Sequence, residues 1–143
     1  MAHELHGRCH CGNLTVTYTT SIAPDDAAVR SCTCSFCRKH GARAVSDPAG
    51  AIAYTARDPD QLRRYRFETG ATDFLICHNC GVYVGAYMED GDEAFANIMV
   101  NVLDDREKYG QDPAPTDYGG EDEAGKRQRR RDNWTPATLR LGG

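Results

Sequence analysis

The hydrophobic positions of the chain predict short β-strands. Over residues 14–19, the apolar residues Leu14, Val16 and Tyr18 alternate with threonines, and this period of two is typical of a half-buried strand. Other apolar or β-branched runs, separated by turn residues, predict further strands at 27–31, 42–46, 51–55, from 65 onward, and at 72–76, 82–87 and 94–102. We therefore expect a mostly β fold of short antiparallel strands and hairpins with a few short helical turns.

Three short helical segments interrupt this pattern. Asp58 followed by Pro59 combines a capping side chain with proline at the first helical position, which predicts a helix of one or two turns. A single turn is expected at 38–40, where Gly41 would stop it. A third short helix is expected at 104–109.

The composition changes near residue 110. Proline, glycine and charged residues dominate 110–132, where an acidic triplet precedes the basic run 126–131. Such a composition predicts a mobile or surface-draped segment, and Trp134 is a candidate to hold its end against the domain. We therefore place a β domain at 1–110 and a charged C-terminal tail at 111–143.

Length and charge narrow the function classes. A chain of 143 residues has room for one domain, while 40% apolar residues and a mean hydropathy of -0.62 indicate a modest core that needs a further source of stability. The net charge of -4 means that the protein has no overall positive potential to attract nucleic acid or an anionic membrane. Because the N-terminal residues lack an apolar run and no stretch approaches the roughly 20 apolar residues of a membrane span, we expect a cytoplasmic protein.

All seven cysteines fall into short-spaced groups. There are two pairs and one triplet: Cys9 with Cys11, Cys77 with Cys80, and Cys32 with Cys34 and Cys37. In a reducing compartment, clustered cysteines are better explained as metal ligands than as disulfides, and their odd number agrees with this. A disulfide scaffold and buried cysteines without metal are the alternatives.

The two pairs together and the triplet divide the seven thiols into a group of four and a group of three. Four thiolates close a structural zinc site, whereas three protein ligands with a vacant fourth position are typical of a catalytic one. Zinc on three thiolates carries a net charge of 1-, which suits activation of an external thiol better than activation of water. Alternatively, His40, His10 or another side chain closes the second site, which is then structural only.

Basic residues beside the triplet are candidates for substrate contacts. Arg38, Lys39 and Arg43 could pair with anionic groups of a substrate, or they are ordinary surface charges. The basic run at 126–131 does not predict a nucleic-acid site, because the acidic neighbours nearly cancel its charge and no aromatic residues interleave it.

The cysteine motifs resemble one known family. Gly-Arg-Cys-His-Cys-Gly at 7–12, Cys-Thr-Cys-Ser-Phe-Cys-Arg at 32–38 with Gly41, and Cys-His-Asn-Cys-Gly at 77–81 are similar to the motifs of the glutathione-dependent formaldehyde-activating enzyme (GFA) family, also called the centromere-protein-V/GFA domain. The resemblance covers roughly the first hundred residues. It implies a β-tent fold and two zinc ions per chain. The implied ligands are Cys9, Cys11, Cys77 and Cys80 for a structural zinc, and Cys32, Cys34 and Cys37 for a catalytic one.

The resemblance also implies a reaction. The family's namesake chemistry joins glutathione to formaldehyde as S-hydroxymethylglutathione, which is classed as a carbon-sulfur lyase activity for the reverse direction. We expect a small-molecule thiol and an aldehyde as partners, with Arg38, Lys39 or Arg43 steering the carboxylates of the thiol and Ser35, His40 or water as candidate proton donors. The alternatives are a non-catalytic, zinc-stabilised protein-binding module and a thiol-based redox or metal-handling protein.

Overall fold

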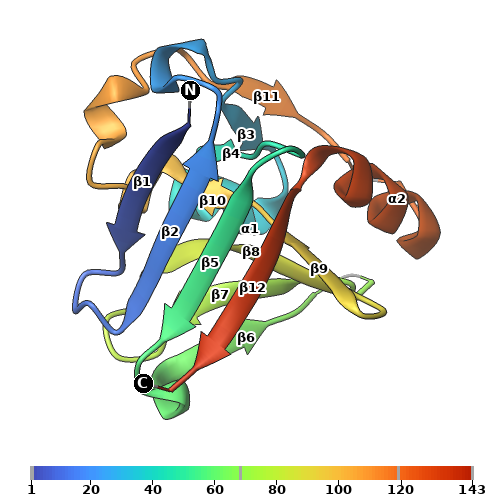
Figure 1. Ribbon diagram of the computed structural model, residues 1–143. Helices are drawn as coiled ribbons and strands as arrows, with labels where there is room; N and C mark the ends of the chain where they lie inside the picture. The colour runs from blue at the N-terminus through green and yellow to red at the C-terminus, as the bar shows by residue number, and fades with distance from the viewer. Residues whose placement is uncertain (1, 68, 119, 143) are drawn as a thin grey trace.

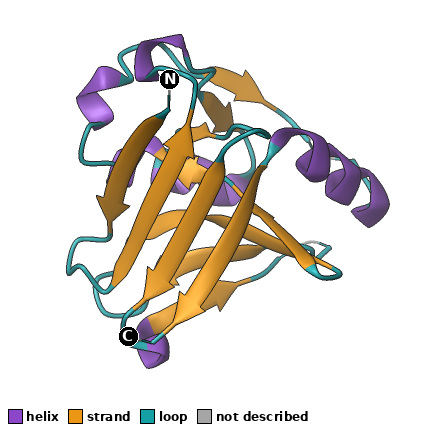
Figure 2. Cartoon of the chain, in the orientation of Figure 1, coloured by secondary structure: helices purple, strands orange, loops and turns teal. Residues whose placement is uncertain are grey.

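Two β-sheets make up most of the fold. The computed structural model describes residues 2–67, 69–118 and 120–142. The larger sheet has eight strands in the order β1-β2-β5-β12-β9-β8-β7-β6 and the smaller has four in the order β10-β4-β3-β11 (Figures 1 and 2). The predicted mostly β fold is confirmed.

The strand bounds follow. In the larger sheet they are β1 (His3–Arg8), β2 (Leu14–Thr20), β5 (Ala51–Ala56), β6 (Leu62–Tyr65), β7 (Asp73–Cys77), β8 (Tyr83–Asp90), β9 (Glu93–Ala96) and β12 (Thr135–Leu141). In the smaller sheet they are β3 (Arg30–Cys32), β4 (Ala44–Val45), β10 (Ile98–Met99) and β11 (Ala114–Thr116). The helices are α1 (Ser35–His40) and α2 (Glu123–Asn133), with short 3-10 turns η1 (Pro24–Asp26), η2 (Pro59–Gln61), η3 (Val100–Val102) and η4 (Arg106–Lys108).

The alternating pattern of β2 produces the expected half-buried strand. Leu14, Val16 and Tyr18 are buried, and they belong to the largest apolar cluster. Strands β2 and β5 pair antiparallel. At the front of Figure 1 they lie beside β12, and β6, β7 and β8 run across behind them. The core therefore lies where the larger sheet folds over on itself.

Several strands differ from their predicted bounds. The run 94–102 forms β9, β10 and η3 in place of one strand. The strand expected to begin at Tyr65 ends there. Strand β1 was not predicted, because Leu5 and Gly7 are its only buried positions. A side chain at Gly7 would collide with the carbonyl of Val102, so glycine permits the close packing of β1 against η3.

The three predicted helical segments are confirmed, with small differences in their bounds. Asp58 caps η2, its side chain accepting a hydrogen bond from the backbone amide of Asp60 at 3.0 Å. Helix α1 begins earlier than expected and ends at Gly41, which has a left-handed φ of 58°. The helix expected near 104–109 is the 3-10 turn η4. Among the described residues, no helix is long and apolar enough to cross a membrane.

The region beyond residue 110 requires a correction. It was expected to be a mobile or surface-draped tail, but it contains β11, helix α2 and β12. Strand β12 lies between β5 and β9 and joins the two halves of the larger sheet. Trp134 is buried beside β8 and β9. The composition was misleading because some charges of α2 pair with distant parts of the chain, such as Arg131 with Asp90 and Glu93.

Candidate active site

The cysteine triplet is built at the junction of β3 and α1. Cys32 ends β3, and Cys34 is the N-cap of α1, where its sulfur accepts a hydrogen bond from the backbone amide of Cys37 at 3.4 Å. One helical turn thus brings Cys37 back over Cys34. The three sulfur atoms lie within 4.8 Å of one another and could hold a metal ion.

The other four cysteines meet at two turns. Cys9 and Cys11 follow β1, while Cys77 ends β7 and Cys80 lies in the turn before β8. The sulfur atoms of Cys9 and Cys11 are 3.7 Å apart, and those of Cys11 and Cys77 are 3.5 Å apart. Thiolates around one tetrahedral zinc would be about 3.8 Å apart, since each Zn–S bond is about 2.3 Å. The spacing therefore fits a four-thiolate metal site.

Backbone amides support this second group. The amide of Leu14 donates to the sulfur of Cys9 at 3.3 Å, and the amide of Cys80 donates to the sulfur of Cys77 at 3.5 Å. Gly12 and Gly81 have φ values of 85° and 80°, which favour glycine in these turns. Amide donors stabilise the thiolate form that metal binding requires.

The structure groups the cysteines as four and three, which is the predicted division. All seven are free thiols. Among the described residues, neither His10 nor His40 joins either group of potential ligands. The ring of His40 packs on Phe36, with 4.6 Å between ring centroids. A histidine that closes the triplet is therefore not found in the described part of the chain.

The triplet opens onto a pocket of about 180 Å³. Cys32, Cys34 and Cys37 all line it, whereas none of the other four cysteines does. The remaining walls include aromatic residues, basic residues and one carboxylate, namely Phe67, Phe74, Tyr83, Tyr118 and Trp134, then Arg30, Lys126, Arg129 and Arg130, and Asp117. The pocket thus combines thiol ligands, an apolar surface and positive charge.

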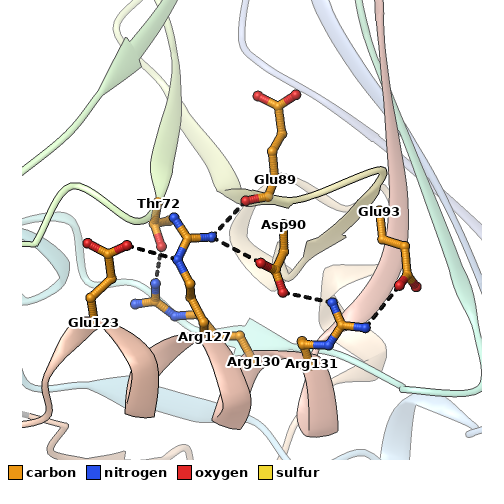
Figure 3. A network of polar contacts seen from close by, with 8 residues as sticks. All are labelled: Thr72, Glu89, Asp90, Glu93, Glu123, Arg127, Arg130 and Arg131. Atoms are coloured by element: carbon orange, nitrogen blue, oxygen red, sulfur yellow. Dashed lines mark hydrogen bonds and ion pairs between the residues drawn. The ribbon is translucent and has the colours of Figure 1, made fainter.

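Helix α2 supplies most of the positive charge in the pocket. Lys126, Arg129 and Arg130 are three and four positions apart and therefore share one face of the helix. On another face, Arg127 and Arg131 contact the β8–β9 hairpin (Figure 3). The basic run is therefore divided between the pocket and the hairpin.

Burial and charge alter the ionisation of the pocket groups. A hydrogen bond with Cys37 is the largest cause that lowers the pKa of Cys32 to about 5, while the same bond raises the pKa of Cys37. Burial raises the pKa of Tyr83 well above its usual value, and the negative charge of the cysteines adds to this effect. Burial also lowers the pKa of Arg130 to about 10. At neutral pH the pocket thus holds a thiolate, a protonated phenol and a guanidinium cation.

The three basic residues predicted to contact substrate lie elsewhere. Arg38 and Lys39 are exposed on α1, and the guanidinium of Arg43 donates to the backbone carbonyl of Tyr109 at 2.6 Å. None of the three lines the pocket. Sequence reasoning selected them because they are close to the triplet in the chain. It missed Arg30, Lys126, Arg129 and Arg130, although the spacing within 126–130 would place three of them on one face if a helix were assumed.

Comparisons with known proteins agree with the cysteine arrangement. Residues 4–116 match the family described as glutathione-dependent formaldehyde-activating enzyme. A crystal structure of a Rhodobacter sphaeroides protein is similar, with 26% sequence identity and a TM-score of 0.51, over 77% of this chain and 97% of that one. No curated protein sequence matches this chain. From the family match over most of its length, the chain belongs to the glutathione-dependent formaldehyde-activating enzyme family.

Proposed function

We propose that the protein is a zinc-dependent enzyme of the carbon-sulfur lyase type. It joins a glutathione-like thiol to formaldehyde or a related aldehyde and gives an S-hydroxymethyl adduct. One observation carries the proposal, namely that the cysteine triplet, and not the four-cysteine group, lines the pocket. Membership of the family supports the same chemistry. Because both groups need reduced thiols, we place the protein in the cytoplasm.

The two cysteine groups have different roles in this proposal. Cys9, Cys11, Cys77 and Cys80 hold a structural zinc, for which a closed set of four thiolates is usual. Cys32, Cys34 and Cys37 hold the catalytic zinc. When bound there, zinc supplies an open coordination position at which an external thiol is held in its reactive thiolate form.

The chain positions the reactants and limits access of water. Phe67 and Phe74 stack with 4.7 Å between ring centroids, and Phe74 packs against Tyr83 at 5.8 Å. Together with Trp134 they give the pocket apolar walls beside the triplet. Such walls suit a small aldehyde, whose hydration would compete with attack by sulfur.

The reaction needs no oxidant, and its net change moves one proton from sulfur to oxygen. The thiol releases its proton to water as it becomes a thiolate, the sulfur forms a bond to the carbonyl carbon, and the carbon–oxygen double bond becomes a single bond as its oxygen is protonated. The group that donates this proton is then reprotonated by water. Tyr83 is the proposed donor, because it lines the pocket and its raised pKa keeps the phenol protonated. The donors considered from sequence, Ser35 and His40, do not line this pocket, although His40 lines a neighbouring one together with Tyr83.

The arrangement favours catalysis over a purely structural second zinc. Among the residues that the structure describes, no histidine or carboxylate completes the triplet. A non-catalytic binding module would have no need for an open ligand set at the base of a pocket. The redox alternative has no observation in its favour beyond the thiols themselves.

Exchange spectroscopy tests the proposal. With ¹³C-formaldehyde and glutathione, the zinc-loaded protein should accelerate exchange between free aldehyde and the S-hydroxymethyl adduct, as measured by ¹³C NMR. Cys34→Ser should abolish the acceleration, whereas Arg38→Gln, which alters an exposed residue outside the pocket, should preserve it. Equal exchange rates with and without the wild-type protein would contradict the proposal.

A further inference from the structure

Arg130 differs from the other arginines of α2. Arg127 pairs with Glu123 and Asp90, Arg129 with Glu121, and Arg131 with Asp90 and Glu93. None of these ion pairs includes Arg130, although Glu121 is near enough to raise its pKa and Asp117 lines the same pocket. Arg130 also lines the pocket, so a ligand that enters can reach it.

The contacts of Arg130 are with neutral groups. One terminal nitrogen donates to the hydroxyl of Thr72 (Figure 3). The guanidinium also lies 4.8 Å from the centre of the Trp134 ring. Its Nε is buried and has no hydrogen-bond partner among the described residues. A buried guanidinium nitrogen without an acceptor is unfavourable, so this half-buried side chain is suited to receive an anionic acceptor from a ligand.

We propose that Arg130 binds a carboxylate of the thiol substrate, so that helix α2 selects small thiols that carry a carboxylate. The inference rests on the proposed function and adds the residue that sets substrate class. The location supports it, because Arg130 and the cysteine triplet line the same pocket. Helix α2 lies beyond residue 116, where the match to the family ends, so this selectivity belongs to the C-terminal part of this chain.

Neighbouring side chains fix the position of Arg130 in the pocket. Arg127 and Arg131 anchor α2 to the hairpin, and the Trp134 ring supports the guanidinium from one side. Arg129 is paired with Glu121 at 3.0 Å and stacks on Tyr118 at 3.4 Å, so its charge is already partly balanced. A carboxylate that enters the pocket therefore meets in Arg130 a cation that is held in place by Thr72 and Trp134 and whose Nε has no hydrogen-bond partner among the described residues.

A second role for the same charge must be distinguished. Arg130 could offset the negative charge of the cysteine triplet, since Cys32 affects its pKa. In that case its loss would weaken metal retention and would not alter the preference between charged and uncharged thiols. Metal retention and ligand preference are therefore measured on the same variants.

Calorimetric titration of the zinc-loaded protein tests the proposal. The probes are S-methylglutathione, which has both carboxylates and no free thiol, and its dimethyl ester, in which both carboxylates are neutral esters. Wild-type protein should bind the diacid more tightly, and Arg130→Gln should reduce this preference by about 10- to 100-fold, which is the usual effect of losing one charged hydrogen bond. Arg130→Lys should retain part of it, and Arg38→Gln, on exposed α1, should retain all of it.

The outcomes separate the two proposals. An unchanged diacid-to-ester ratio in both Arg130 variants, or no binding of the diacid to the wild type, would overturn the carboxylate role. Faster zinc loss to a chromogenic chelator with an unchanged ratio would assign Arg130 to the cysteine cluster and would also overturn it. Binding of the probes does not depend on the reaction, because they carry no reactive thiol. If Arg130→Gln loses the preference while the wild type shows no formaldehyde exchange, Arg130 binds the carboxylate but the protein is not the proposed enzyme.

Discussion

Arg131 forms an ion pair with Asp90, its Nη1 lying 2.7 Å from a carboxylate oxygen. The contact joins residues 41 positions apart and fastens α2 to the β8–β9 hairpin (Figure 3). Asp90 also lies 3.5 Å from Arg127, and Glu93 pairs with Arg131 at 2.9 Å. Because a neighbouring face of α2 forms a pocket wall, this small network couples the surface of the protein to the geometry of the candidate active site.

Asp90→Asn should therefore affect substrate binding more than stability. Asp90 is about a quarter exposed, and ion pairs of this kind contribute about 1 kcal/mol or less, so the melting temperature should fall only slightly. The Michaelis constant for glutathione should rise several-fold, and the effect should diminish at high salt, where the ion pairs of the wild type are themselves screened.

Asp92→Asn is the matched control, because Asp92 is exposed in the turn beside Asp90 and forms no ion pair within the described chain. Its steady-state kinetics should match those of the wild type. Equal Michaelis constants for Asp90→Asn and the wild type at low salt would show that the network does not position the pocket wall.

The two cysteine groups should differ in their effect on folding. Cys77→Ser removes a ligand of the four-cysteine group, where zinc binding in comparable small sites contributes on the order of 10 kcal/mol to folding. Circular dichroism should show the loss of a cooperative transition. Cys34→Ser should remain folded while binding about one zinc fewer by mass spectrometry, because serine is a good replacement for the N-cap of α1.

A chelator should reveal the same difference in the wild type. The triplet metal, which has three ligands and faces a pocket, should leave first without loss of structure. Metal loss from the four-cysteine group should coincide with unfolding. Simultaneous loss of both metals with retained circular dichroism would contradict the division into structural and catalytic sites.

The packing of Tyr54 against Gly85 should be visible as energetic coupling. The Tyr54 hydroxyl donates to the carbonyl of Asn97 at 2.6 Å, and a β-carbon at Gly85 would collide with that hydroxyl. Tyr54→Phe should cost about 1–3 kcal/mol through the lost buried hydrogen bond. Gly85→Ala should cost a similar amount through overpacking, about 1–3 kcal/mol.

The double variant should be less destabilised than the sum of the single variants, because removing the hydroxyl relieves part of the collision. Chemical denaturation of the four proteins measures this coupling. Strict additivity would contradict a direct contact between the two positions.

The sequence predicted those features that depend on local pattern. Alternation placed Leu14, Val16 and Tyr18 on the buried face of β2, and spacing grouped the cysteines correctly. Asp58 and Gly41 act at the helix ends where their chemistry places them. These features follow from neighbours in the chain.

The basic groups of the pocket could not be located in this way. Arg38 and Arg43 are near the triplet in sequence but do not line the pocket, whereas Arg129 and Arg130 line it from almost a hundred positions further along. Their arrangement depends on β12 entering the sheet beside β5. Pairing over such a distance is set by tertiary packing, which composition alone does not report.

Tyr83 provides the sharpest test of the chemical step. Tyr83→Phe keeps the ring that packs edge-on against Phe36 at 5.0 Å between centroids, and it removes only the phenolic proton. If Tyr83 donates that proton to the carbonyl oxygen, kcat for aldehyde addition should fall by about 100-fold or more, with binding of S-methylglutathione unchanged.

Tyr87→Phe is the control for Tyr83→Phe, since Tyr87 is buried on the same strand but does not line the pocket. Exchange rates from ¹³C NMR at saturating thiol measure the chemical step for both variants. A large fall in Tyr83→Phe alone would identify the phenol as the proton donor. Equal rates in the two variants would instead mean that water protonates the oxygen, and Tyr83 would then serve only as an apolar wall of the pocket.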